Sequence, residues 1–381
     1  MKVNISTLVV YWLLVDLPYL FYRTLLFLRQ DVKRKSEQSS PYVSVLIPAY
    51  NEEETIAEAL DSAARQRYPN FEIIVIDDGS ADRTKEIVQK LETLQAHRSP
   101  LRPINLIRLE KNQGKANALN AGLKRSQGEI IVTMDADTFL APRALSEIVK
   151  PFSNVKVGAV AGTIKTVERG SVISLLQKVD YEIGIDLIRY TQSKLGVALV
   201  TPGAFSAYRK SILHAFELGT LTEDFDTSSK ILKLGYEVRM AVDAIAYTQV
   251  PIGISGLIKQ RVRWQQGGFE VYSKRDLFSS GIFKGIEWFF TFFYGFVGVY
   301  NRLITLAFVP LFFYNSIIIL PYFLAYSVLY WVYFGFLTFM RTRSIESLTI
   351  APLYALYQHT ILAYATIIGQ LRALKRERKW E

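Results

Sequence analysis

Residues 43–48 read VSVLIP, and residues 71–77 read FEIIVID. Both are short β-branched runs of strand length, and TIAEALDSAA at 55–64, with apolar residues at helical spacing, lies between them. The alternation continues through INLIRL, EIIVTMD and VGAVAG, which begin at residues 104, 129 and 157. Repeated β-then-α units predict an α/β domain with a mostly parallel sheet and helices on both faces.

An apolar run near the N-terminus, Thr7–Leu28, is long enough for one tilted transmembrane helix. It is too long for the apolar part of a signal peptide, and it lacks a small-residue cleavage site. The sequence that follows, RQDVKRKSEQSS at 29–40, is rich in positive charge, which marks the cytoplasmic side of a membrane. We therefore expect residues 1–30 to anchor the chain in the plasma membrane, with the α/β domain in the cytoplasm.

The chain becomes apolar and aromatic again toward its end, with three candidate transmembrane segments at Phe290–Phe313, Ser316–Met340 and Leu348–Gln370. Three membrane spans after a cytoplasmic domain would leave the basic sequence RALKRERKW outside, although positive charge favours the cytoplasmic side. Either one candidate segment is interfacial or re-entrant, or the charge rule fails here. The mixed apolar and basic stretch before them predicts interfacial amphipathic helices, with an ordinary surface helix as the alternative. The predicted order is a membrane helix at 1–30, the α/β domain at 41–250, interfacial helices at 251–289, about three membrane segments at 290–371 and a basic tail at 372–381.

The composition excludes some kinds of metal site and scaffold and limits the kinds of partner. The 381 residues carry a formal net charge of +10, no cysteine and three histidines far apart in the sequence. A disulfide scaffold and a thiolate metal site are excluded, and a zinc cluster is disfavoured. The positive charge fits nucleic acid, an anionic membrane surface or a phosphorylated substrate. Because no nucleic-acid-binding motif is present, we expect membrane lipids and a phosphorylated substrate as partners, and no nucleic acid.

Polar and aromatic residues follow the first two predicted strands. Ligands of open parallel sheets bind at the carboxyl ends of strands, where Ala49, Tyr50, Glu52 and Asp78 stand. Tyr50 suits stacking on a base, and the two carboxylates suit hydrogen bonds from a base or ribose. Each also fits a local role, since acidic residues start helices and Asp-Gly-Ser favours a turn.

Lys115 follows Gly114 at the start of a predicted helix, an arrangement that favours a bound diphosphate. No GxxxxGK[ST] is present and no GxGxxG follows the first strand, so neither a P-loop nor a dinucleotide fold is indicated. Asp135, Ala136 and Asp137 end the fourth apolar run. Carboxylates at i and i+2 are hard oxygen ligands, so they predict a Mg²⁺ or Mn²⁺ site that bridges to a diphosphate, although a lone Asp-x-Asp is common in loops.

Glu223 and Asp224 follow Thr222 at the start of another predicted helix. They fit an ordinary N-cap with an acidic first turn. Asp224 also fits a general base that takes a proton from an acceptor hydroxyl. Pro202 and Gly203, earlier in the chain, suit a wall beside such an acceptor.

Gln260, Arg263 and Trp264 lie on one face of a predicted helix by the i, i+3, i+4 rule. Arg263 suits a diphosphate, and the Trp264 ring suits the apolar face of a sugar. A tryptophan beside an arginine equally fits a membrane anchor.

Six motifs occur in this order: PAYNE, DDGS, NQGKANALNAG, MDADT, LTEDFD and QRVRWQQGG. Together they closely resemble the inverting family 2 glycosyltransferases of the Rossmann-like GT-A fold. The best match is the branch of membrane-embedded synthases of poly-N-acetylglucosamine, chitooligosaccharide, hyaluronan, chitin and cellulose. No single motif is specific, but six in register span the whole α/β domain, and the resemblance implies a hexosyltransferase.

The resemblance implies a role for each matching position. The uridine diphosphate of the donor would be held by Ala49, Tyr50, Glu52, Asp78, Lys115, Asp135, Ala136, Asp137, Gln260, Arg263 and Trp264. Asp137, supported by Asp135, would ligate Mg²⁺ or Mn²⁺. Asp224 would be the base, with Glu223 beside it. The acceptor would contact Pro202, Gly203, Glu223 and Trp264.

The stretch 221–268 is most similar to the poly-N-acetylglucosamine and chitooligosaccharide synthases, which implies UDP-N-acetylglucosamine as donor and a processive β-glycosyltransferase. No C-terminal gating signature of the hyaluronan or cellulose type is present, and the membrane part is small, so a second copy or an export partner would complete a channel. The alternative is a non-processive glycolipid synthase that adds one or two sugars to a membrane lipid. A non-catalytic membrane subunit is a further alternative, which the intact acidic residues disfavour.

Overall fold

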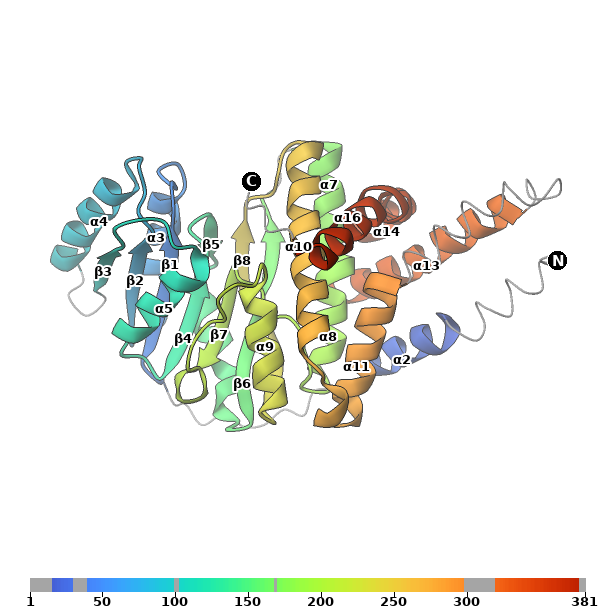
Figure 1. The fold of residues 1–381 in the computed structure, drawn as a ribbon, viewed down its shortest axis with the longest axis horizontal. Coiled ribbons are helices and arrows are strands. Elements are labelled where there is room, and N and C mark those ends of the chain that lie inside the picture. The colour runs from blue at the N-terminus through green and yellow to red at the C-terminus, as the bar shows by residue number, and fades with distance from the viewer. Residues whose placement is uncertain (1–15, 30–39, 99–102, 168–169, 298–318, 377–381) are drawn as a thin grey trace. The chain divides into compact units, whose positions relative to one another are not determined.

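The computed structural model describes residues 16–29, 40–98, 103–167, 170–297 and 319–376 (Figure 1). Two compact units divide the chain. The first, here called the sheet unit, comprises Lys33–Val167 and Gly196–Val250. The second, the helical unit, comprises Met1–Val32, Glu168–Leu195 and Pro251–Glu381. The sheet unit thus differs from the predicted domain 41–250 mainly in residues 168–195, which belong to the helical unit.

One eight-stranded sheet, in the order β3-β2-β1-β4-β7-β6-β8-β5, forms the core of the sheet unit. Its strands are β1 (Val43–Ala49), β2 (Phe71–Asp77), β3 (Ile104–Arg108), β4 (Ile130–Met134), β5 (Thr138–Leu140), β6 (Val157–Thr166), β7 (Phe205–Arg209) and β8 (Glu237–Thr248). The five predicted strands are confirmed as β1 to β4 and β6. The strands β3, β2, β1 and β4 run parallel, as predicted. The sheet as a whole is mixed, because β7 lies antiparallel between β4 and β6, and β5 lies antiparallel to β8.

Helices pack against this sheet because their apolar residues recur at helical spacing (Figure 1). They are α3 (Ile56–Ala64), α4 (Thr84–Arg98), α5 (Lys115–Arg125), α6 (Ala144–Val149) and α9 (Glu223–Lys233), with short 3₁₀ turns at Lys150–Ser153 and Lys210–Ile212. The contact of α5 with β1 and β2 is close. A Cβ on Gly122 would lie 2.7 Å from the Ile76 side chain and 3.2 Å from that of Leu46. The predicted helices at 55–64 and 115–123 are confirmed.

The helical unit contains α2 (Leu17–Leu28), α7 (Val172–Val179), α8 (Ile188–Ser193), α10 (Ile254–Lys274), α11 (Ile282–Phe292), α13 (Ile319–Thr342), α14 (Glu346–Thr349), α15 (Ala351–Tyr357) and α16 (Ala363–Leu374). Helical stretches with π geometry occur at Asp180–Leu187, Phe293–Val297 and Gln358–Leu362, and a 3₁₀ turn at Phe278–Ser280. Its core gathers Val179, Ile183, Leu257, Phe334 and Tyr354. These residues come from α7 to α15, so segments distant in the sequence share one core.

A search of the described residues finds no helix with both the length and the apolar composition needed to cross a membrane. Residues 1–15 of the predicted anchor and residues 298–313 of the predicted span Phe290–Phe313 lie outside the described ranges. The predicted span Ser316–Met340 overlaps α13 from residue 319 onward, and its residues 316–318 lie outside the described ranges. The predicted span Leu348–Gln370 overlaps the helical run from α14 to α16.

Candidate active site

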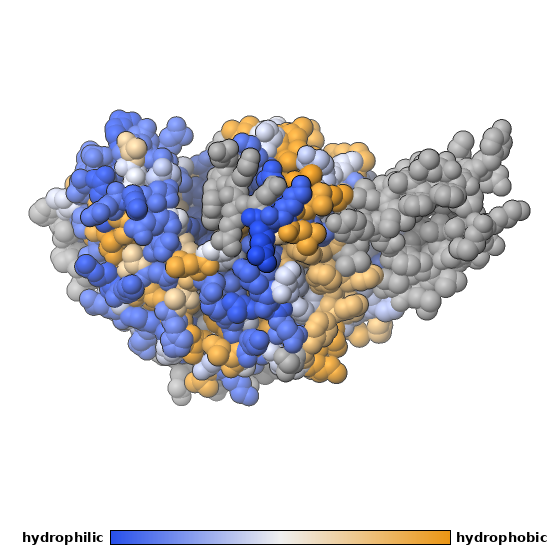
Figure 2. Space-filling model, in the orientation of Figure 1, coloured by the Kyte–Doolittle hydropathy of each residue, from blue (hydrophilic) through white to orange (hydrophobic). Residues whose placement is uncertain are grey.

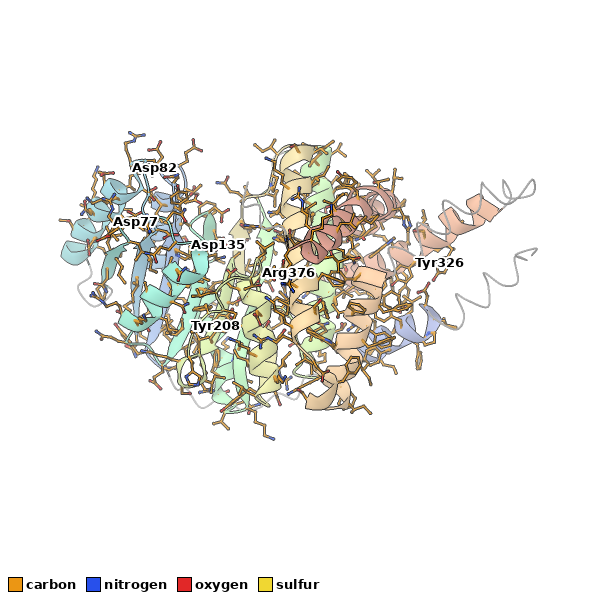
Figure 3. The ribbon with its side chains drawn as sticks, viewed as in Figure 1. Asp77, Asp82, Asp135, Tyr208, Tyr326 and Arg376 are labelled. Carbon is orange, nitrogen blue, oxygen red and sulfur yellow. The ribbon has the colours of Figure 1, made fainter. Side chains whose placement is uncertain are left out.

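The polar residues predicted to follow β2 and β4 lie at the carboxyl ends of those strands. Asp77 is the last residue of β2, and Asp135 follows β4 directly; Figure 3 shows both toward the same end of the strands. The Asp135 backbone N–H donates to the carbonyl of Ala204, which precedes β7. The Asp-x-Asp turn is therefore fixed between β4 and the chain entering β7, at the sheet edge where ligands of parallel sheets bind.

Lys115 joins two of the predicted motifs. Its Nζ lies 2.6 Å from Asp135 Oδ1 and 3.2 Å from Glu223 Oε1. Burial opposes the charge on Lys115, but the carboxylates of Asp135 and Glu223 outweigh it and raise the pKa of the ammonium. Lys115 is therefore a fixed positive charge between the Asp-x-Asp turn and the start of α9. A third of the Lys115 side chain remains exposed.

Asp78 holds the loop that leads to Lys115. Its Oδ1 accepts the backbone N–H of Gln113, and its Oδ2 accepts that of Gly114, each at 2.8 Å. The side chain is buried. The structure thus shows that Asp78 positions this loop, whereas the predicted contact of Asp78 with the donor stays a prediction.

Asp224 is oriented by two backbone donors. Its Oδ2 accepts the N–H of Gly203 and its Oδ1 accepts the N–H of Phe225, each at 2.8 Å. Each carboxylate oxygen keeps a lone pair for a further partner. Burial, and then the negative charge of Glu223, raise the pKa of Asp224 to about 6, while Lys115 acts against them. A carboxylate with this pKa is ionised at neutral pH and is more basic than an ordinary aspartate, as a general base requires.

Asp137 stands among negative charges. Burial, followed by the charges of Asp135 and Glu52, raises the pKa of Asp137 to about 7. Among the described residues, no three histidine, aspartate or glutamate side chains gather as a metal site. Mg²⁺ is commonly held by one or two carboxylates together with substrate phosphates. Asp137 and Asp135 fit that donor set, because a cation would offset the burial and the neighbouring negative charges that together raise the pKa of Asp137.

The loop after β1 carries the predicted base-binding residues. Tyr50 is 46% exposed, so its ring is available to a ligand. Glu52 Oε2 accepts the Thr55 hydroxyl at 2.7 Å. Ala49 is buried at the end of β1, and Ala136 is buried between the two aspartates.

Sequence reasoning missed three residues that hold this loop. The hydroxyls of Ser80 and Thr84 accept the backbone N–H groups of Asn51 at 3.0 Å and Glu52 at 2.8 Å. Asp82 accepts the N–H of Glu53 at 3.0 Å. The signal was the run of Ser, Asp and Thr after the Asp-Asp-Gly turn, since these short side chains favour hydrogen bonds to the backbone.

Gly203 lies where a side chain would disturb the site. A Cβ at this position would stand 2.6 Å from Lys115 Nζ and 3.5 Å from Asp224 Oδ2. Pro202 precedes it, and the Pro202 carbonyl accepts the Ser206 hydroxyl at 2.6 Å. The predicted glycine wall therefore adjoins the candidate base.

The Gly203→Ala variant is expected to fold normally and to lose about 10- to 100-fold in kcat/KM, because a small displacement of an active-site group is costly. The added methyl group meets the flexible end of Lys115, so the ammonium moves away from Asp135 and Glu223 while the backbone stays in place. Gly253→Ala is the matched control, because nothing lies within 4 Å of its added Cβ. Enzyme kinetics and melting temperatures of both variants test this. Wild-type kinetics for Gly203→Ala would contradict it.

The remaining predicted residues lie on α10, in the helical unit. Arg263 is exposed, and Gln260 and Trp264 are partly buried. Trp264 lines a cavity of about 240 Å³ within this unit, whose aromatic walls include Tyr294 and Trp331. The roles of these three motif residues in binding the donor stay predictions.

Comparison with known proteins agrees with these observations. Residues 44–216 match the model of Glycosyl transferase family 2. A poly-beta-1,6-N-acetyl-D-glucosamine synthase of Staphylococcus epidermidis is 34% identical over 275 residues, which are 71% of this chain and 65% of that protein. The enzyme of the same name from Staphylococcus aureus (strain COL) is 31% identical over 278 residues, again 71% and 65% of the two chains. This chain therefore spans less than two thirds of the length of these relatives.

A solved structure shares the fold. The mannosyltransferase of Pyrobaculum calidifontis, in complex with GDP-Man and Mn²⁺, superposes with a TM-score of 0.71 at 21% identity. The superposition covers 95% of both chains. The predicted GT-A-like α/β fold is thus confirmed.

Proposed function

We propose that this chain, whose residues 44–216 match the model of Glycosyl transferase family 2, transfers N-acetylglucosamine from a UDP-sugar to a growing β-linked glycan, with inversion at the anomeric carbon. The observation that carries the proposal is the link made by Lys115. One ammonium contacts Asp135 of the Asp-x-Asp turn and Glu223, the neighbour of the candidate base Asp224. Lys115 and Asp135, which suit a leaving diphosphate, therefore lie in one site with Asp224, which suits an acceptor hydroxyl.

A single displacement fits these residues. The acceptor oxygen attacks the anomeric carbon, its proton passes to the Asp224 carboxylate, and the bond from that carbon to the diphosphate breaks. Gly203 and Phe225 hold the carboxylate for this step through their N–H groups. Lys115 is placed to receive the charge of the departing diphosphate. A divalent cation, held by Asp137 and Asp135, would neutralise further charge on that leaving group.

The pH dependence follows from the pKa of Asp224, which burial and Glu223 raise to about 6. The base acts in its ionised form, so kcat/KM should be constant above pH 7 and fall about tenfold per pH unit well below 6. The profile is measured with saturating Mn²⁺, so that proton competition at Asp137 does not contribute. A flat profile down to pH 4.5 would exclude Asp224 as the base.

The names of the relatives support the choice of sugar and product, since they are poly-beta-1,6-N-acetyl-D-glucosamine synthases. The aromatic cavity beside Trp264 supports an acceptor with apolar faces, which a glycan and a lipid-linked sugar both have. The experiment presents radiolabelled UDP-sugars with Mg²⁺ or Mn²⁺ and sizes the products. A ladder made from UDP-N-acetylglucosamine supports the polymer synthase. A single organic-extractable product would replace it with a glycolipid synthase, and transfer only from other donors would refute the choice of sugar.

We further propose that the chain works at the cytoplasmic face of the plasma membrane. Exposed Leu17, Phe21, Leu25 and Leu28 form a stripe along α2. Figure 2 shows hydrophobic side chains gathered over α11, whose exposed residues include Ile282. Such stripes suit the boundary of lipid headgroups and acyl chains. Recovery of the detergent-free chain in the supernatant of a high-speed spin would contradict this localisation.

A further inference from the structure

A buried ion pair lies inside the helical unit, next to the motif on α10. Arg261 Nη2 and Nε lie 2.9 Å and 3.2 Å from Asp180 Oδ2. Arg261 is 2% exposed and Asp180 is 5% exposed. Removing two charges from water is costly, so a buried ion pair is weak evidence for a purely stabilising role.

Arg261 contacts two residues of the motif. Its Nη1 donates to Gln260 Oε1 at 2.6 Å, and its guanidinium lies over the Trp264 ring, 4.2 Å from the ring centroid. Arginine has donors only, so the Gln260 amide must turn its oxygen toward Arg261. The amide nitrogen of Gln260 is thereby directed to donate elsewhere, and one face of the Trp264 ring is covered.

Asp180 is itself held from another helix. The Tyr354 hydroxyl on α15 donates to Asp180 Oδ1 at 2.8 Å, and the Gln358 amide donates to the Tyr354 oxygen. A Cβ on Gly184 would stand 2.5 Å from the Tyr354 oxygen, so the glycine permits this approach. The position of Arg261 therefore depends on a hydrogen bond that spans 174 residues of sequence.

A second buried pair in the same unit provides a comparison. Arg23 Nη2 lies 2.7 Å from Glu287 Oε2, and the Tyr22 hydroxyl donates to Glu287 Oε1 at 2.7 Å. Arg23 is 1% exposed and Glu287 is fully buried. As with Arg261, Asp180 and Tyr354, a buried arginine pairs with a carboxylate that also accepts a tyrosine hydroxyl. None of the contacts that the structure gives for the Arg23 pair reaches Gln260 or Trp264.

We propose that Arg261 is a positioning residue for sugar transfer, held by Asp180 and Tyr354, which sets the donor direction of the Gln260 amide and the ring plane of Trp264. This inference rests on the proposed function, because it requires that Gln260 and Trp264 contact substrate. It gives a role to Arg261, which lies between the motif residues Gln260 and Arg263. It also extends the functional residues to α15, far from the motif in sequence.

The test compares two hydroxyl deletions in the full-length protein. Tyr354→Phe removes the hydrogen bond to Asp180, and Tyr22→Phe removes the equivalent bond to Glu287. The proposal predicts that Tyr354→Phe raises KM for the donor or acceptor about threefold to tenfold, with kcat less affected, because one hydrogen bond is lost. Tyr22→Phe should keep wild-type KM values, although its melting temperature should fall about as much as that of Tyr354→Phe.

Arg→Lys substitutions provide the second comparison. Lysine keeps the charge but lacks the planar fork, so it cannot contact Asp180 and Gln260 in the same way. Arg261→Lys should lower kcat/KM at least tenfold. Arg23→Lys should keep the wild-type kcat/KM when it is assayed below the melting temperature of that variant. The proposal would be overturned if the two Tyr→Phe variants changed KM equally and the two Arg→Lys variants changed kcat/KM equally. A wild type that transfers no sugar would instead refute the proposed function, so the two failures are distinguishable.

Discussion

The Asp224→Asn variant is expected to lose sugar transfer by about 10²- to 10⁴-fold, the usual contribution of general base catalysis. Asparagine has nearly the same shape, and its oxygen can still accept one of the two backbone N–H groups that hold Asp224. It cannot take a proton from the acceptor. Binding of UDP should remain within a few fold of wild type, because Lys115 and Asp135 are unchanged.

Asp226 provides the control for this variant. It is a buried carboxylate two positions further along α9, and it is assigned no part in the chemistry. Asp226→Asn should keep transfer within a few fold of wild type. A loss as large as that of Asp224→Asn would mean that any change in α9 abolishes activity, which would contradict the role of Asp224. Single-turnover assays with UDP titrations on both variants separate binding from chemistry.

The Asp137→Asn variant is expected to lose about 10²- to 10³-fold in turnover, as removal of one group that stabilises developing charge does. Burial, Asp135 and Glu52 raise the pKa of Asp137 to about 7, so its charged form is disfavoured in the folded protein. The ordinary pKa of an aspartate is 3.8, so the folded protein loses stability as the pH rises from that value to about 7, and a neutral asparagine avoids this loss. At pH 8 without metal, the variant should therefore melt at a higher temperature than wild type.

Metal binding supplies the second measurement on Asp137. Mn²⁺ should raise the melting temperature of the wild type, since a ligand that binds only the folded state stabilises it, and this rise should be absent in Asp137→Asn. Asp243→Asn is the control, because Asp243 is an exposed carboxylate on β8. An unchanged Mn²⁺ response in Asp137→Asn would show that the cation does not bind at this residue.

The strands that hold the site could be predicted because they are buried on both faces. β1 and β2 are mostly apolar and rich in Val and Ile, with Ser44 and Glu72 as buried exceptions, and every residue of β2 is buried. β7 and β8 were not predicted. β7 has five residues that follow a Pro-Gly turn, and β8 alternates buried and exposed residues with an irregular register near Ala161. β7 is too short to show a clear period, and the shifted register of β8 against β6 is set only in the completed sheet.

The sequence indicated which residues form the site, but not the contacts between them. Strand ends and acidic spacing indicated Asp135 and Asp224. The link through Lys115 and the backbone bonds of Asp78 arise only when three loops meet in the folded chain. Arg261 lies within the motif QRVRWQQGG, but its contacts could not be predicted, because its partners Asp180 and Tyr354 lie in distant segments.

UDP binding and sugar transfer can be measured together in the same preparations of wild type and variant. Wild type and Asp224→Asn are incubated with UDP-N-acetylglucosamine labelled in the sugar, and incorporated label is compared with released UDP. We expect label in a β-linked product from wild type, and none from a variant that still binds UDP. A variant that transfers at the wild-type rate, or a wild type that binds UDP but forms an α-linked product, would contradict it.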